Sequence, residues 1–197
     1  MDHAANAAGI PGLKGVGALF AEYPEDDWIM VMDVNCNAVF YCCKYEIQEM
    51  LKAKKGSIVN IASTAELIAY PYQCFSSNWN WLKVGVYIAS KHAVIGKSNV
   101  LAHTYCEGLT KSAALEHTSS GIRINAVAHG FTQTNLLKAL SNDRAAFGAM
   151  AESVPAKRIA YPDEIAELVV FLLSDKSSYI SGSVHLSDGA HLAGTPP

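Results

Sequence analysis

Ser57–Ala62 reads SIVNIA, a short apolar run in which consecutive side chains are suited to burial. A strand that is apolar on both of its faces is typical of a parallel sheet, because helices then cover the sheet on both sides. Ile122–Ala128, which reads IRINAVA, has the same character further along the chain. These two segments therefore predict strands of an α/β protein.

Strand-like and helix-like segments alternate around these two runs. Ala4–Ala8 predicts a first short strand, and Ser183–Leu186 predicts a last one. One helix is expected to begin near Tyr87, and another is expected to run from Pro162 through Leu173. Parallel strands joined by helices predict a doubly wound, Rossmann-like sheet in three αβα layers. Ligands of such a fold bind beyond the carboxyl ends of the strands.

A long apolar helix is expected before the SIVNIA strand. It begins at Pro24–Asp27, where acidic side chains face the positive end of the helix dipole. Its Trp28–Cys43 part is apolar on nearly every side, which predicts that the sheet buries one side and another subunit the other. Lys52–Gly56 then supplies the cations and the glycine that commonly end a helix.

Composition is that of a globular chain and excludes several classes of function. The 197 residues are 50% hydrophobic and 17% charged, which predicts a packed core and a single domain over 1–197. A formal net charge of −3 provides no basic surface for nucleic acid. The apolar runs are too short for a membrane span and Met1–Gly9 has no signal-peptide pattern, so we expect a cytoplasmic protein. Cysteine and histidine spacings predict no metal site.

Tyr87 and Lys91, in the segment YIASK, carry the strongest chemical signal in the chain. Side chains four residues apart on a helix lie on the same face. A phenol with an ordinary pKa of about 10 is a poor acid or base at neutral pH, and a neighbouring ammonium favours its ionised form. Ser63 follows the SIVNIA strand and is suited to hydrogen-bond a reacting oxygen. An ordinary helix with a packed tyrosine and a solvated lysine has the same spacing, so the motif alone leaves both interpretations open.

In chain order, these segments resemble the short-chain dehydrogenase/reductase family. The matching segments are NAAG at 6–9, DVN at 33–35, IAS at 61–63, YIASK at 87–91, INAVAHG at 124–130 and DG at 188–189. Ala7 stands where the family has a second asparagine, and His129 where it has a proline. The resemblance covers nearly the whole chain.

The resemblance implies a catalytic tetrad. Tyr87 would be the acid and base of the reaction, and Lys91 would make the phenol more acidic and hold the nicotinamide ribose. Ser63 would orient the substrate oxygen, and Asn35 would support a water-linked proton path. A hydrogen bond from Asn35 to a backbone group is the alternative.

The resemblance also implies NAD or NADP as the cofactor, without deciding between them. Beside Tyr87 and Lys91, the side towards the adenosine would be lined by Asn6 and Gly9. The backbone of Thr132 and the side chain of Thr134 would meet the nicotinamide amide. The alternatives are a simple turn at 6–9 and a helix cap at 132–134.

Several features depart from the family pattern. The chain begins almost at its NAAG segment, so we expect the N-terminal strands and the glycine-rich pyrophosphate loop to be missing. Gly12–Gly17 (GLKGVG) lacks the spacing of that loop and predicts a surface loop. Gln73–Lys83 and Lys97–Gly108 resemble insertions or sequence errors. In the first of them, Trp79 and Trp81 are candidates for lining a substrate pocket, with exposed loop residues as the alternative.

The favoured hypothesis is an NAD(P)(H)-dependent oxidoreductase that interconverts a small alcohol and a ketone or aldehyde by hydride transfer. The family resemblance adds a homodimer or homotetramer as the expected assembly. The alternative is a non-catalytic relative that cannot hold the cofactor and acts only through oligomerisation. A serine hydrolase around Ser63 is disfavoured, because IASTA lacks the flanking glycines of a nucleophile elbow.

Overall fold

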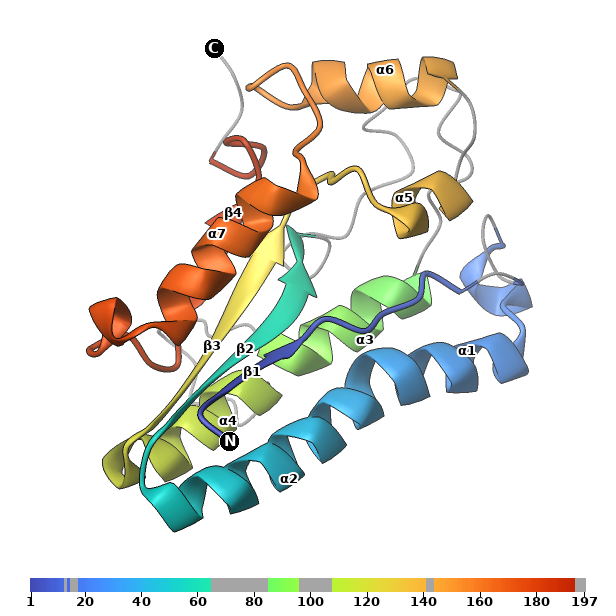
Figure 1. The fold of residues 1–197 in the computed structure, drawn as a ribbon. Coiled ribbons are helices and arrows are strands. Elements are labelled where there is room, and N and C mark those ends of the chain that lie inside the picture. The colour runs from blue at the N-terminus through green and yellow to red at the C-terminus, as the bar shows by residue number, and fades with distance from the viewer. Residues whose placement is uncertain (13, 15–17, 65–84, 96–107, 141–143, 194–197) are drawn as a thin grey trace, which may run out of the picture.

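Within the described residues, four parallel strands form one sheet in the order β1-β2-β3-β4 (Figure 1). The computed structural model describes residues 1–12, 14, 18–64, 85–95, 108–140 and 144–193. The strands are β1 (His3–Asn6), β2 (Gly56–Ser63), β3 (Ile122–His129) and β4 (Val184–Ser187). This confirms the predicted parallel sheet. The first strand ends at Asn6 and not at Ala8, so the prediction for its carboxyl end was wrong by two residues.

The strand register leaves a step at the carboxyl edge of the sheet. β2 and β3 pair along their whole length, from Gly56 opposite Ile122 to Ser63 opposite His129. β1 pairs with β2 only as far as Asn6 opposite Asn60. The last three residues of β2 therefore project beyond the end of β1. This step is where the polar residues of the candidate site gather.

Helices cover both faces of the sheet, as predicted (Figure 1). One face carries α1 (Glu25–Met32), the π turn η2 (Asp33–Asn37), α2 (Ala38–Ala53), α3 (Gly85–Ile95) and α4 (Leu109–His117), whereas the other carries α7 (Pro162–Leu173). Beyond the carboxyl edge lie α5 (Asn135–Leu140) and α6 (Arg144–Ser153). Short helices in the described residues include η1 (Phe20–Glu22), η4 (Thr118–Ser120) and η5 (Asp175–Ser177). None of the helices in the described residues is long and apolar enough to cross a membrane.

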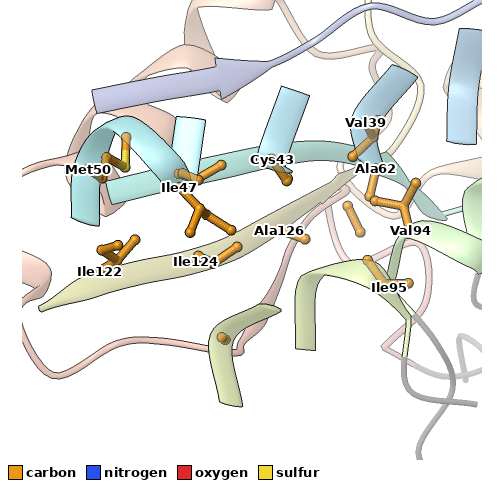
Figure 2. Close-up of a cluster of buried hydrophobic side chains, with 13 residues drawn as sticks. Val39, Cys43, Ile47, Met50, Ala62, Val94, Ile95, Ile122, Ile124 and Ala126 are labelled. Atoms are coloured by element: carbon orange, nitrogen blue, oxygen red, sulfur yellow. The ribbon is translucent and has the colours of Figure 1, made fainter. Parts of the chain in front are cut away.

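Alternating strand residues build a separate core on each face. Figure 2 shows the larger core, in which Ile47 and Met50 of α2 face Ile122 and Ile124 of β3. The other face packs residues such as Val59 of β2 against α7. Both faces of β2 are buried, which explains why its sequence is apolar without alternation.

The predicted long helix is continuous from Glu25 to Ala53, with the π turn in its middle. In α2 the buried residues Val39, Cys43, Ile47 and Met50 pack against the sheet, whereas Asp27, Val31 and Asn35 are buried beside the segment that follows β1. The opposite side of the long helix is exposed in the single chain and includes Trp28, Ile29, Phe40, Tyr41 and Tyr45. Burial by the sheet is thus confirmed, whereas the expected second subunit stays a prediction.

The end of this helix differs from the prediction. The capping residue is Lys54, which adopts the left-handed conformation with φ of 51°. Gly56 already begins β2, and a Cβ atom there would collide with the side chain of Met50. The glycine is therefore required by helix–strand packing and not by the helix cap.

Other predictions have mixed outcomes. The helix expected from Tyr87 towards His117 corresponds to α3 and α4, and residues 96–107 between them lie outside the described residues. Residues 73–83, with Trp79 and Trp81, also lie outside the described residues. Gly12 is buried with φ of +80°, so the predicted surface loop does not begin at this residue. The absence of N-terminal strands and of a glycine-rich loop stays a prediction.

Candidate active site

Tyr87 and Lys91 lie together on the face of α3 that packs against the end of β2. The Lys91 side chain is only 3% exposed, and its Nζ donates a hydrogen bond of 2.9 Å to the Ile61 carbonyl. The same Nζ lies 5.8 Å from the centroid of the Tyr87 ring. The alternative of a solvated lysine is therefore wrong. A buried ammonium next to a phenol is a pair of titratable groups of the kind that occurs at functional sites.

Ser63 completes this group at the last position of β2. It is almost fully buried, two residues beyond the carbonyl that holds Lys91. The step in the sheet edge lets β2 carry Ser63 past the end of β1. Strand and helix thus bring the hydroxyl, the phenol and the ammonium to the carboxyl edge, where ligands of parallel sheets bind.

Asn35 is fully buried in the π turn, and its side chain holds the segment that follows β1. Its Oδ1 accepts a hydrogen bond from the Ile10 N–H and its Nδ2 donates one to the Ile10 carbonyl, both at 2.8 Å. Nδ2 also donates to Ser90 Oγ at 3.1 Å, and Ser90 donates to the Tyr87 carbonyl at 2.8 Å. The backbone alternative for Asn35 is therefore confirmed, and it connects two parts of the site.

Gly9 lies directly over these groups. A Cβ atom at this position would stand 3.5 Å from both Asn35 Oδ1 and Lys91 Nζ. The missing side chain therefore leaves space next to the ammonium. The NAAG turn consequently forms part of the same site as Tyr87 and Lys91.

The Asn6 side chain points into the helical layer. Its Nδ2 lies 3.1 Å from Glu46 Oε2 and 3.0 Å from Asn60 Oδ1. Asn60 in turn donates to Thr110 Oγ1 at 3.0 Å. Burial raises the pKa of Glu46, although the hydrogen bond from Asn6 opposes this shift. The side-chain amide of Asn6 is therefore engaged by residues of the protein interior, and only the main chain of Asn6 is left to contact a cofactor.

Thr132 and Thr134 follow β3 in a loop at the same edge. Thr134 caps α5, because its Oγ1 accepts a hydrogen bond of 3.3 Å from the Leu137 N–H. Thr132 is buried, its carbonyl accepts from the Thr134 N–H at 2.8 Å, and its Oγ1 donates to the Gly130 carbonyl at 3.0 Å. The capping alternative therefore holds for Thr134 and not for Thr132.

His129, which stands where the family pattern has a proline, lies beside these groups. It ends β3 opposite Ser63, and its Nδ1 lies 2.8 Å from the Gly130 carbonyl oxygen. Burial lowers the pKa of His129, and the positive charge of Lys91 acts in the same direction. Its position at the end of a buried strand, paired with Ser63, is the signal that could have identified it.

These groups fit the hydroxyl-rich ribose and the amide of a nicotinamide cofactor. The Lys91 ammonium and the Tyr87 hydroxyl are hydrogen-bond donors, and the absence of a side chain at Gly9 leaves space beside the ammonium. Among the residues that the structure describes, no cluster of histidine, cysteine, aspartate or glutamate could hold a metal ion.

Comparison with known proteins relates nearly the whole chain to one family. The sequence model of a family described as enoyl-(acyl carrier protein) reductase matches residues 1–190. The chain is 38% identical over 180 residues to cyclohexanol dehydrogenase of Acinetobacter sp. strain SE19. This match covers 91% of the chain and 61% of that enzyme, so the chain spans about three fifths of this relative.

Solved structures of similar proteins have the same fold. One is gluconate 5-dehydrogenase from Burkholderia cenocepacia J2315 in complex with NADP and tartrate, with a TM-score of 0.81 and 27% identity over 99% of this chain and 66% of that one. Another is 4-hydroxyisoleucine dehydrogenase complexed with NADH, with a TM-score of 0.78 and 30% identity over 98% of this chain and 69% of that one.

Proposed function

Since the chain belongs to the short-chain dehydrogenase/reductase family, we propose that the protein is an NAD(P)(H)-dependent oxidoreductase that interconverts an alcohol and a ketone or aldehyde. One observation carries this proposal: the buried Lys91 ammonium is fixed to the Ile61 carbonyl beside the Tyr87 ring, at the strand end that carries Ser63. Burying a lysine costs free energy unless its charge is used or paired, which favours a chemical role for it.

Tyr87 is the acid and base of the proposed reaction. When bound, the nicotinamide gives or takes the hydride. The Tyr87 hydroxyl gives a proton to the carbonyl oxygen during reduction and takes it back during oxidation. The Lys91 ammonium favours the phenolate that forms in the reductive direction, because the two groups lie on one face of α3. Ser63 donates a hydrogen bond to the same substrate oxygen.

Asn35 supports proton exchange from the π turn. Its side chain is occupied by Ile10 and Ser90, so a water molecule on the proton path would bind through the main chain. A π turn interrupts the regular hydrogen-bond ladder of a helix, and such interruptions are frequent at functional sites. The side chain of Asn35 meanwhile keeps α3 and the turn after β1 together.

The cofactor is NAD or NADP, held along the step in the sheet edge. Tyr87 and Lys91 bind the nicotinamide ribose, and the Thr132 main chain with the Thr134 side chain meets the amide. Gly9 and the Asn6 main chain line the side towards the adenosine. Among the similar solved structures, gluconate 5-dehydrogenase is in complex with NADP and 4-hydroxyisoleucine dehydrogenase with NADH, which leaves both cofactors for the test.

The proposed substrate is a small alcohol or carbonyl compound, and the proposed assembly is a homodimer or homotetramer. A cyclic alcohol is the first choice for the assay, because cyclohexanol dehydrogenase is among the similar proteins. A second copy of the chain is expected to cover the apolar side of α1 and α2, whose Trp28, Phe40 and Tyr45 are otherwise exposed.

The test uses the full-length protein and its Tyr87→Phe variant. NADH and NADPH are titrated by nicotinamide fluorescence, and turnover is then measured with cyclohexanol and cyclohexanone. We expect saturable binding by both proteins and a loss of about 10²- to 10⁴-fold in kcat for Tyr87→Phe. Tyr179→Phe, at a fully exposed phenol far from the site, is the matched control.

Two outcomes would overturn the proposal. Undiminished turnover by Tyr87→Phe would remove the acid–base role. A folded protein that binds neither cofactor would favour the non-catalytic alternative, in which these residues are retained without their chemistry.

A further inference from the structure

His129 forms a closed set of contacts around one carbonyl. Its Nδ1 lies 2.8 Å from the Gly130 carbonyl oxygen and 3.2 Å from Thr132 Oγ1. Thr132 Oγ1 also donates to that carbonyl, at 3.0 Å. In the part of the chain that the structure describes, the hydrogen bonds to this carbonyl come from these two side chains alone.

These contacts determine the tautomer of the imidazole. A carbonyl oxygen can only accept, so the hydrogen must lie on Nδ1 of His129. Burial keeps the ring neutral at neutral pH, because it lowers the pKa of His129. Nδ1–H and the Thr132 hydroxyl thus supply a donor for each lone pair of the Gly130 carbonyl.

The main chain around this carbonyl is held from both sides. The Gly130 N–H donates to the Ser187 carbonyl at 3.0 Å, and the Gln133 N–H donates to the Ala160 carbonyl at 2.9 Å. A Cβ atom on Gly130 would lie 2.9 Å from Asp188 Cα, so the loop passes very close to the segment after β4. Between these two points the Phe131 carbonyl also accepts from the Ala160 N–H at 2.9 Å, so Ala160 holds the Thr132 side of the segment. On the Gly130 side, the orientation of the carbonyl is held by the His129 imidazole and the Thr132 hydroxyl.

We propose that His129 is a positioning residue for the cofactor, which acts through the Gly130 carbonyl and the Thr132 hydroxyl to set the main chain of Thr132. This inference rests on the proposed function, in which the Thr132 main chain meets the nicotinamide amide. The effect extends to α5, because the Thr132 carbonyl accepts from the Thr134 N–H and Thr134 caps that helix.

Position 129 requires an uncharged hydrogen-bond donor to the Gly130 carbonyl. Lys91 is close enough for its charge to oppose protonation of the imidazole. A second cation at this strand end would therefore be unfavourable, whereas an uncharged N–H satisfies the carbonyl without adding charge. Asparagine meets this requirement, because its side-chain amide occupies the place of Nδ1. Glutamine places its amide nearer to the position of Nε2.

The experiment compares His129→Asn, His129→Gln and His129→Ala in the full-length protein. Amide hydrogen exchange of residues 130–137 is measured without cofactor, and then the Kd of NADH or NADPH, kcat and KM are measured. We expect His129→Asn to stay within about twofold of the wild type in exchange and Kd. His129→Gln and His129→Ala should exchange about tenfold faster and bind cofactor about tenfold more weakly, as for one lost hydrogen bond, with a smaller change in kcat at saturating cofactor.

The matched control is His117→Asn, which makes the same chemical change at the end of α4, away from the strand ends of the site. It should alter neither exchange nor Kd. The proposal is overturned if His129→Asn behaves like His129→Ala, if all three variants match the wild type, or if kcat falls while Kd stays unchanged.

Hydrogen exchange separates this proposal from the proposed function, because it is measured without cofactor. If the wild type binds no cofactor and the exchange order still holds, the cofactor role of the loop is overturned together with the proposed function. If the wild type binds cofactor and the exchange order fails, the inference on His129 alone is overturned.

Discussion

The side chain of Asn35 pairs with the main chain of Ile10 in both directions, accepting from its N–H and donating to its carbonyl at 2.8 Å each. This is the pattern that a neighbouring strand would provide, supplied here by one amide from a helix. Because Asn35 also donates to Ser90 on α3, it joins the turn after β1 to the helix that carries Tyr87 and Lys91. The geometry of the site therefore depends on a buried residue.

Replacing Asn35 should cost more stability than its small size suggests. Asn35→Ala leaves the half-buried N–H and carbonyl of Ile10 and the buried Ser90 hydroxyl without this partner, so we expect the free energy of unfolding to fall by about 2–3 kcal/mol. Urea denaturation measures this change. Asn37→Ala, in the same turn but exposed, is the control and should change little. An equal effect of the two variants would contradict the role of the Ile10 pairing.

Lys91→Met keeps the length and the apolar stem of the side chain and removes only the ammonium. The Ile61 carbonyl loses its donor and the Tyr87 phenolate loses its stabilising charge, so we expect kcat to fall at least about 10²-fold. Steady-state kinetics with saturating cofactor measure this loss. Lys111→Met on α4, outside the site, should retain full activity. Retention of activity by Lys91→Met would remove the lysine from the mechanism.

Arg123 should be the strongest polar contributor to the stability of the α7 layer. Its guanidinium donates to the carbonyls of Leu172, Leu173, Ser174 and Ile180 and to Ser177 Oγ, at 2.8–3.4 Å. Arg123→Ala removes five hydrogen bonds from this region, although Ser57 and Ser177 still donate to the Leu172 carbonyl, and a loss of about 2–3 kcal/mol is expected on urea denaturation. Arg158→Ala breaks only an exposed pair with Glu164 and should have little effect.

Acid should destabilise the protein at a pH where histidines titrate. Burial lowers the pKa of His129, His185 and His191 in the folded chain below the ordinary 6.5. Above about pH 6.5 these rings are neutral in both the folded and the unfolded chain. Below it the unfolded chain binds protons first, so the free energy of unfolding falls as the pH falls towards the folded pKa values. Thermal unfolding between pH 7.5 and 5.5 measures this slope.

His185→Phe should reduce that slope. Among the described residues, His185 Nε2 is enclosed by protein and has no hydrogen-bond partner, so an apolar ring removes both the unsatisfied atom and the titration. We expect a higher Tm at pH 5.5 and a smaller fall from pH 7.5. His3→Phe, at an exposed position of β1, should keep the wild-type slope. An unchanged slope in His185→Phe would show that this ring is not one of the groups responsible.

Local patterns in the sequence predicted the layers of the fold and several element ends. β2 and β3 were predictable because both faces of each strand are buried, and α7 because Pro162 is favoured in the first turn of a helix. The π turn was not predictable, since DVN fits an ordinary helix and Asn35 is held by residues far along the chain. Lys54 in a left-handed cap gave no composition signal either.

In the candidate site, too, features that depend on local sequence were predictable, whereas those that depend on contacts between distant residues were not. Tyr87 and Lys91 were predictable as neighbours because their spacing is local to one helix. The orientation of the Asn6 amide was not, because its partner Glu46 lies 40 residues away on a helix whose packing the sequence does not reveal. The contact of His129 with Gly130 depends on the path of a loop that strands and helices on both sides hold in place.

The Asn6–Asn60 amide contact has a consequence for how the sheet assembles. β1 has four residues, and sliding it by one position would turn Asn6 to the opposite face, away from Asn60 and Glu46. The hydrogen bond between the two amides therefore favours the observed register of β1 over a shifted one. The register of β1 also determines where the chain leaves the sheet, and therefore the position of Gly9 relative to Lys91. Correct pairing of β1 is therefore required for the site as well as for the core, against which Ala4 packs.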